Sequence, residues 1–239
     1  QNSDSRLVYS YQYYLSVILS EKVIVHGEAD LYEMLYNKDN DKMPPEFKGG
    51  FPGDVREGIY GFNKARAFDY SYGYLQYSSA IGDIIFSMEP LIWGNGIHPI
   101  ILSNNVNPFP ALIWRKSIGQ SRFTYLHGSI SGVNQDVLLS DNIDLAATYN
   151  VGNIEKYIVS HRWEIVLSKK LRGAFTEMLI YGGRDPELSY LLPSSLLWSV
   201  QHNTNNFDNI LWFIETEYFL STGIKLYSTI FIDELSIKR

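Results

Sequence analysis

Apolar and polar residues alternate with a period of two along much of the chain. Between Leu7 and Ser20 every odd position is Leu, Tyr or Val, whereas most even positions carry Ser or Gln. Successive side chains of a β-strand point to opposite faces of a sheet, so this alternation predicts a long strand with one apolar face. The same pattern returns from Val159 to Ser168, where Val, His, Trp, Ile and Leu alternate with Ser, Arg and Glu.

Further strands are predicted wherever such alternation recurs between turn signals. We expect them from Val23 up to Asn37 and over Val55 to Phe62, Ala65 to Ser79, Ile84 to Met88, Ala111 to Lys116, Arg122 to Ile130, Ala174 to Tyr181, Leu196 to His202, Ile210 to Phe219 and Ile224 to Glu234. Residues 37 to 54 and 132 to 157 are rich in polar and turn-forming residues and are interpreted as loops. No segment has a convincing helical period, so the predicted fold class is all-β with about a dozen antiparallel strands.

Alternation by itself does not separate a soluble sandwich from a membrane barrel, because each has one apolar and one polar face. Strand length favours the barrel, since a membrane strand needs about 9 to 11 residues and ordinary strands centre on about 5 to 6. The aromatic share of 15%, with 18 Tyr, suits aromatic girdles at membrane interfaces, although a tyrosine-rich soluble β-protein would look similar. We predict a single domain over residues 1–239, a transmembrane β-barrel or part of one.

Ionisable side chains of both signs recur on the polar face. In a barrel they would line the lumen, whereas in a sandwich they would form an ordinary solvated face. The predicted lumen-lining charges are Glu89, Arg115, Arg162, Glu164, Glu177, Glu215 and Glu217. We expect these groups to form ion pairs and to crowd the interior.

The amino-acid composition excludes several kinds of function and site. The net charge of −6 leaves no basic surface for the phosphates of a nucleic acid. Cysteine is absent, which excludes disulfides and thiolate metal sites. No apolar run approaches the roughly 18 residues of a membrane helix, so a chain of this kind would cross a bilayer with strands. The chain begins without Met or a leader, and we expect a processed chain or a fragment.

The connection over residues 91 to 110 has the strongest turn chemistry in the chain. Gly94 and Gly96 permit backbone angles that other residues disfavour, and Pro108 and Pro110 fix the backbone before the next strand. These residues predict one ordered conformation. Whether the loop only joins two strands or also binds a ligand is left open by its residues alone.

Three short motifs in this loop resemble the signature of the capsule assembly Wzi family, and they occur in the family's order: Trp93-Gly94-Asn95-Gly96, Leu102-Ser103-Asn104-Asn105 and Pro108-Phe109-Pro110. Later segments are similar too, namely Tyr125-Leu126-His127, Thr176 to Gly183, Asp208-Asn209, Leu226-Tyr227 and Ile232-Asp233-Glu234. The resemblance runs from about residue 65 to 235. It implies a β-barrel in the outer membrane of a Gram-negative bacterium, here a fragment without the family's N-terminal region and last strands.

The resemblance also implies a function, which is to bind capsular or related exopolysaccharide at the cell surface and to help attach it. Sugar binding needs aromatic faces for stacking beside amide hydrogen-bonding groups on a preformed loop. The candidate glycan-binding residues are Trp93, Asn95, Asn104, Asn105 and Phe109. That these residues only shape the loop remains an alternative. We expect a monomer in contact with outer-membrane lipid, with no cofactor.

Catalytic and metal sites have weaker support. The histidines form no closely spaced pair, so no metal site is predicted. His127 and Ser129 share a strand face, as a nucleophile and base would, but no Gly-x-Ser-x-Gly elbow is present. Glu215 and Glu217 could be glycosidase acids, although adjacent lumen charges more often form ion pairs. We predict no enzymatic activity; a porin-like channel is the first alternative, and a barrel hydrolase follows.

Two predictions concern orientation. Val159, Trp163, Ile165 and Leu167 are expected to face lipid, and Arg162 and Glu164 the interior. An arginine at Ile165 would then cost about 2 to 4 kcal/mol in a membrane, and one at Ser160 little. Counting strands from the short turns at Gly119-Gln120 and Lys169 to Gly173 places 92 to 109, 132 to 157 and 182 to 193 on the external side, and 37 to 54 on the opposite side.

Overall fold

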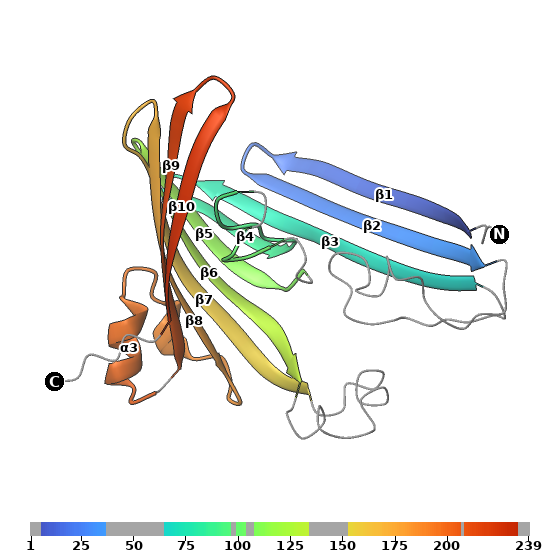
Figure 1. The fold of residues 1–239 in the computed structure, drawn as a ribbon. Helices are drawn as coiled ribbons and strands as arrows, with labels where there is room; N and C mark the ends of the chain where they lie inside the picture. Colours follow the sequence, from blue (N-terminus) through green and yellow to red (C-terminus); the bar gives the residue numbers. More distant parts are fainter. Residues whose placement is uncertain are drawn as a thin grey trace, which may run out of the picture.

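A computed structural model describes residues 6–36, 65–96, 99–103, 108–133, 153–206 and 208–233. Ten strands in these residues form one antiparallel sheet in sequence order (Figure 1). They are β1 (Arg6–Ser20), β2 (Val23–Tyr36), β3 (Ala65–Ser79), β4 (Gly82–Met88), β5 (Ala111–Ile118), β6 (Ser121–Val133), β7 (Asn153–Val166), β8 (Leu171–Gly182), β9 (Asn209–Ser221) and β10 (Ile224–Asp233). The sheet is not closed: β1 and β10 are its two edges.

The all-β class is confirmed, and most strands lie where alternation predicts them. One strand prediction is wrong, because Leu197–Asn203 forms the helix α3 instead of a strand. A short apolar run is compatible with a buried strand and with a buried helix, and the contacts it makes in the folded chain determine which of the two forms. β7 also begins inside the predicted loop 132 to 157, at Asn153. The predicted strand at Val55 to Phe62 lies outside the described residues.

The curled sheet has two faces of different chemistry. Residues that are paired in register on neighbouring strands point to the same side of a sheet. One row of paired residues across β5 to β9 therefore identifies each face. The concave face contains the row Arg115, Thr124, Arg162, Thr176 and Phe213. The convex face contains the row Trp114, Tyr125, His161, Glu177 and Trp212.

The predicted alternation along β7 is confirmed. Arg162 and Glu164 lie on the concave face, whereas Trp163 lies on the convex face in register with Phe175. The expectation that Ser160 tolerates an arginine is wrong, because Ser160 is fully buried and its Oγ donates to the Glu177 carbonyl at 2.8 Å. A strand position on the polar face can still be covered by other parts of the chain.

The two ends of the sheet differ in their connections. Turns of at most four residues join β1 to β2, β3 to β4, β5 to β6, β7 to β8 and β9 to β10, and together they form the short-turn end. The connections 37–64, 89–110, 134–152 and 183–208 all leave the opposite, long-connection end. Residues 37 to 54 lie outside the described residues, but the strands that flank them, β2 and β3, end and begin at the long-connection end, so the predicted placement of this loop on the opposite side is wrong. Two strands, β3 and β4, separate it from 89–110, and an even number of antiparallel strands returns the chain to the same end.

Each face carries its own packed cluster. On the concave face, loop residues Ile101, Leu102 and Phe109 pack on Ile113 and Leu126 of the sheet. On the convex face, the segment 183–208 packs over the half of β6 to β9 nearest the long-connection end. That segment contains α3 and the short helix η2 (Leu188–Leu191). Neither helix of the described residues is long and apolar enough to cross a membrane.

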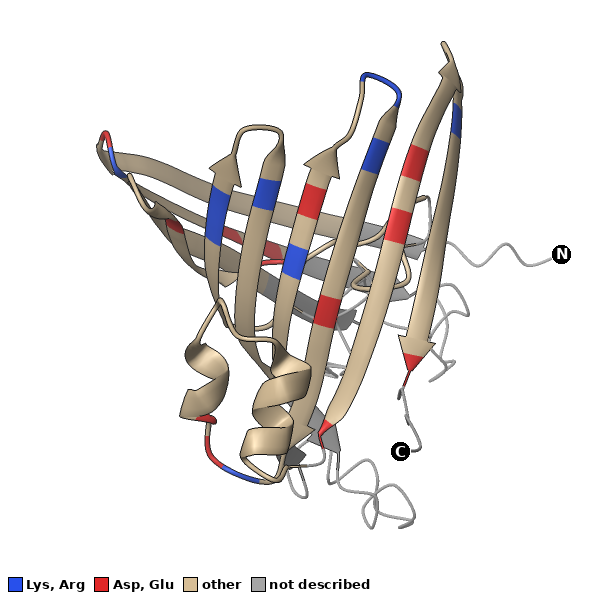
Figure 2. Ribbon diagram, turned by 90° about the vertical axis from the view of Figure 1, so that its left-hand side faces the viewer, with Lys and Arg blue, Asp and Glu red and all other residues tan. Residues whose placement is uncertain are grey.

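The remaining half of the convex face, toward the short-turn end, is uncovered and apolar. We call it the apolar band; its exposed side chains are Ile84, Ile118, Trp163, Phe175, Ile214, Leu226 and Ile230. Most charged residues of β5 to β10 lie in the half of the strands toward the short turns, as the coloured bands in Figure 2 show. The sheet therefore carries apolar side chains on one side and most of its charges directly behind them.

Candidate functional site

The connection between β4 and β5 folds back over the concave face (Figure 1). Trp93 and Leu102 exchange two backbone hydrogen bonds, at 2.8 and 3.0 Å, which close the loop into a small hairpin. Gly96 has a φ of +95°, and a Cβ on it would lie 2.5 Å from the Tyr227 ring. This position therefore needs glycine for its backbone angle and for the close approach. The predicted ordered loop is confirmed for the described part of this connection.

Two of the candidate glycan-binding residues tie this loop to the sheet. The Asn95 amide Nδ2 donates to the backbone carbonyl of Thr216 on β9 at 3.3 Å. The Trp93 ring centroid is 5.8 Å from the guanidinium carbon of Arg162, within reach of a cation–π contact. Although the loop starts and ends at the long-connection end, its tip thus points into the concave face.

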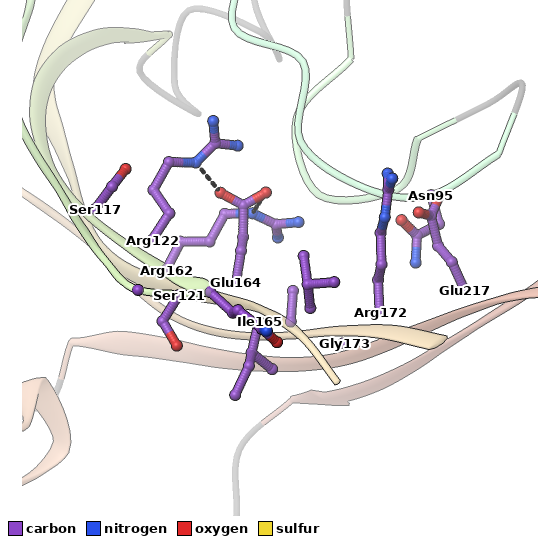
Figure 3. Close-up of a pocket in the computed structure, with 14 residues that line it drawn as sticks. Asn95, Ser117, Ser121, Arg122, Arg162, Glu164, Ile165, Arg172, Gly173 and Glu217 are labelled. Atoms are coloured by element: carbon purple, nitrogen blue, oxygen red, sulfur yellow. Dashed lines mark hydrogen bonds and ion pairs between the residues drawn. The ribbon is translucent and has the colours of Figure 1, made fainter. Parts of the chain in front are cut away.

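A polar pocket of about 400 Å³ lies between this loop tip and the concave face near the short-turn end (Figure 3). Strands β5 to β9 supply its walls, and Asn95 reaches it from the loop. Its polar lining consists mainly of Asn95, Arg122, Arg162, Glu164, Arg172 and Glu217. Three guanidinium groups and two carboxylates therefore surround one small space.

Most of these charges are already paired. Arg122 Nε donates to Glu164 Oε2 at 2.7 Å, and Arg162 Nε lies 3.6 Å from Glu164 Oε1. Arg162 Nη1 also forms hydrogen bonds with Thr176, at 2.8 Å, and with Glu215. Arg162 and Glu215 are buried, 6% and 1% exposed, and a buried charge is tolerated only when it is paired. This network holds β6, β7, β8 and β9 together from within.

Arg172 is the guanidinium most available to a ligand. It stacks 5.0 Å from the Phe219 ring centroid, and the described residues give it no carboxylate partner. Its register neighbour Glu217 instead accepts a hydrogen bond from Lys225 Nζ at 2.8 Å. With Asn95 beside it in the pocket, Arg172 offers planar donors of the kind that bind vicinal hydroxyls or a carboxylate.

The predicted lumen-lining set is placed on the concave face with one exception. Glu89 accepts a hydrogen bond from Ser87, and Arg115 lies in register with Asp83. Arg162, Glu164, Glu215 and Glu217 belong to the network above. Glu177 is the exception, because it lies on the convex face. Its odd position in β8 groups it with Phe175 and Leu179, a signal that the sequence did contain.

Glu177 has a structural partner that the sequence did not reveal. Its Oε2 accepts the backbone N–H of Leu197 at 3.0 Å, and its Oε1 accepts that of Trp198 at 3.1 Å. These are the free amides of the first turn of α3, which no side chain of its own cap residue satisfies. His161 Nδ1 lies 3.6 Å from the same carboxylate. Glu177 thus holds the helix against the sheet.

The other candidate glycan-binding residues differ in their placement. Asn104 and Asn105 lie outside the described residues. Phe109 is 7% exposed, and its ring packs so closely that a Cβ on Gly128 would lie 2.6 Å from it. The ring of Phe109 therefore has little free surface on which a sugar could stack, and we leave it out of the site.

The residues considered for catalysis are engaged in other contacts. His127 Nε2 is 3.0 Å from the Tyr181 hydroxyl, and its Nδ1 is 3.3 Å from the Tyr125 hydroxyl. Glu215 and Glu217 bind Arg162 and Lys225. Among the described residues, no group of three or more His, Asp or Glu side chains is arranged to hold a metal ion.

A second polar network fastens the segment 183–208. Arg184 donates to both carboxylate oxygens of Asp208, at 2.9 and 2.5 Å, and the Tyr190 hydroxyl donates to the same carboxylate at 2.5 Å. Burial, together with the hydrogen bond to Asp208, raises the pKa of Tyr190. The hydrogen bond to Asp208 raises the pKa of Arg184. This network could not be predicted from local sequence patterns, because Tyr190 and Arg184 are 18 and 24 residues away from Asp208.

Comparison with known proteins adds no relative. No protein-family model matches the chain. No curated protein matches it at a significant level of similarity. Neither comparison therefore identifies a family or a function for the chain.

Proposed function

We propose that this chain forms the wall of an outer-membrane β-barrel that binds capsular or related exopolysaccharide and helps attach it at the cell surface. The proposed membrane location is supported above all by the contrast between the exposed apolar band and the charged concave face behind it. Outer-membrane barrels have this arrangement, with lipid outside and a polar interior. The proposal requires the β1 and β10 edges to be joined, directly or through further strands.

The ends of the sheet support the same proposal. Outer-membrane barrels have short turns on the periplasmic side and longer loops outside. The sheet has this asymmetry, because its short turns share one end and its long connections the other. The apolar band lies toward the short turns, so the segment 183–208 with its ion pair between Arg184 and Asp208 would stand above the bilayer. Strands of 12 to 15 residues, such as β1, β7 and β8, are long enough to cross and to extend beyond it.

The loop supports a binding protein over an open channel. A porin-like channel needs an unobstructed polar lumen. Here the described part of the connection 89–110 packs on the concave face, and the Arg162 network narrows the space beside it to a small pocket. We therefore place the channel second and predict little ion current through the intact protein.

The polysaccharide part rests on the resemblance to the capsule assembly Wzi family and on the chemistry of the pocket. In the pocket, Asn95 offers an amide and Arg172 a guanidinium without a carboxylate partner in the described residues. Trp93 offers an aromatic ring that contacts Arg162 but is not part of the pocket lining. These are the groups with which proteins bind sugars and their carboxylates. The proposed ligand is a capsular or related chain of sugars.

The proposal is tested by capsule retention on cells carrying Asn95→Ala with Arg172→Gln, with the surface level of folded protein measured in parallel. Lost retention at a normal surface level is expected if the pocket binds the glycan. Asn209→Ala, an exposed amide outside the pocket, is the matched control and should retain capsule. Full retention by the double variant at a normal level would remove the pocket from the binding site.

A further inference from the structure

A second hollow lies on the convex face, away from the loop and its pocket. It has a volume of about 800 Å³ and lies between residues 193–196 and strands β5 to β8. Its walls are mainly apolar and aromatic, and include Trp114, Phe123, Trp163, Phe175 and Leu196. We call this hollow the convex groove. Its volume is within the range of sites that hold small molecules, about 300 to 1,000 Å³.

The convex groove has a single cationic side chain in its lining. Lys116, near the end of β5, lies at the short-turn end of the groove, and its Nζ donates to the Ala80 carbonyl in the turn between β3 and β4. This bond holds the ammonium group beside the aromatic walls. The carboxylate of Glu177, which also borders the groove, is engaged by the first turn of α3. The groove thus has a positive end and an apolar body.

We propose that the convex groove binds an anionic phospholipid, with an acyl chain along the aromatic side chains and the phosphate at Lys116. The charge of the lining complements an amphiphile that has one anionic head and an apolar tail. The groove also opens onto the apolar band, since Trp163 and Phe175 belong to both, so an acyl chain can enter it from lipid. This inference rests on the proposed membrane location and is independent of polysaccharide binding.

The test measures quenching of tryptophan fluorescence in the full-length protein reconstituted into vesicles. Phosphatidylcholine vesicles receive increasing fractions of either phosphatidylglycerol or phosphatidylcholine with brominated acyl chains, which quench on contact. Trp114 lines the groove and reports its occupancy, whereas Trp163, which also belongs to the apolar band, reports contact with the surrounding lipid as well. We expect phosphatidylglycerol to reach half-maximal quenching at about a fivefold lower fraction, the effect of one lysine near an anionic lipid.

Two lysine variants make the test specific. Lys116→Gln should abolish the preference for phosphatidylglycerol. Lys169→Gln removes the same charge from an exposed turn at the same end of the sheet, outside the groove, and should leave the preference intact. Thermal unfolding of each variant shows whether the fold is retained.

Each other outcome overturns the proposal. Equal quenching by the two brominated lipids would remove the lipid site while leaving the membrane location in place. Equal quenching together with a dimer that Leu196→Glu dissociates would assign the groove to a second copy of the chain. No quenching by either lipid would overturn the membrane location and the groove together. Capsule retention, measured separately, would then decide the polysaccharide part on its own.

Discussion

Two adjacent residues of β7, Arg162 and Trp163, lie in opposite environments, and the difference between them indicates what surrounds the sheet. Arg162 is 6% exposed on the concave face, whereas Trp163, the next residue, is 56% exposed on the convex face. In a soluble protein the large apolar side chain is the one expected inside, and an arginine is rarely buried. Because Ile214 and Glu215 of β9 repeat this inversion, at 43% and 1% exposed, we infer that the medium outside the convex face is itself apolar.

The two halves of the convex face make a second comparison. Toward the long connections, η2 and α3 cover Val159 and Leu179, which are fully buried. Toward the short turns, Phe175 and Ile214, which share a row, are exposed. The same strands therefore use the chain itself to shield one half of their apolar face, and we propose that lipid shields the other.

The largest loss of stability is expected from a substitution on the concave face. Arg162→Ala leaves the buried carboxylate of Glu215 without its guanidinium partner, and we expect a loss of about 3 to 5 kcal/mol in the free energy of unfolding. Arg122→Ala breaks a more exposed pair with Glu164 and should cost about 1 kcal/mol or less. Urea unfolding of both variants measures the difference, and equal costs would mean that the concave network is not a buried one.

The next effect tests the convex side with two neighbours on β10. Ile230 is exposed in the apolar band, and Thr229 lies on the concave face in register with Glu215. In a bilayer, Ile230→Arg should cost about 2 to 4 kcal/mol. Thr229→Arg should cost clearly less, because position 229 lies on the concave face beside charged residues of β9.

The measurement is the folding equilibrium of both variants in lipid vesicles. If Ile230→Arg changed stability by only about 0.5 kcal/mol, as is usual at a water-exposed site, the apolar band would face water and the proposed barrel would be excluded.

A smaller effect tests how the covered half is held. Glu177→Gln removes the carboxylate that accepts the first amides of α3, and loss of a helix cap costs about 0.5 to 2 kcal/mol. Hydrogen exchange at the amides of Leu197 and Trp198 should become faster by a corresponding factor. Unchanged exchange at these two amides would mean that apolar packing alone holds the segment.

The smallest effect concerns the loop on the concave face. Trp93→Ala removes the cation–π contact with Arg162, which we expect to stabilise the fold by about 0.5 to 1 kcal/mol. Trp93→Phe keeps an aromatic ring and should restore most of it. Thermal unfolding compares the two variants. An alanine variant as stable as the parent would leave Trp93 free to act in ligand binding alone.

The sequence by itself determined the elements that depend on local patterns. The alternation from Leu7 to Ser20 and the bounds of β3 were predicted correctly, because a strand's period appears directly in its residues. The glycines of the loop at 91 to 110 were read correctly for the same reason, since backbone angles at Gly94 and Gly96 are local properties. Six of the seven charged residues predicted to line the interior lie on the concave face, as the same alternation predicts.

Only the tertiary structure decided the features that join distant parts of the chain. Leu197–Asn203 is a helix because Glu177, about 20 residues away, accepts its first amides. The loop points inward because Asn95 reaches a carbonyl 121 residues away on β9. The alternation along one strand specifies two faces, but it does not state what covers either of them. That depends on contacts whose partners are far apart in sequence, and these form only when the sheet curls around them.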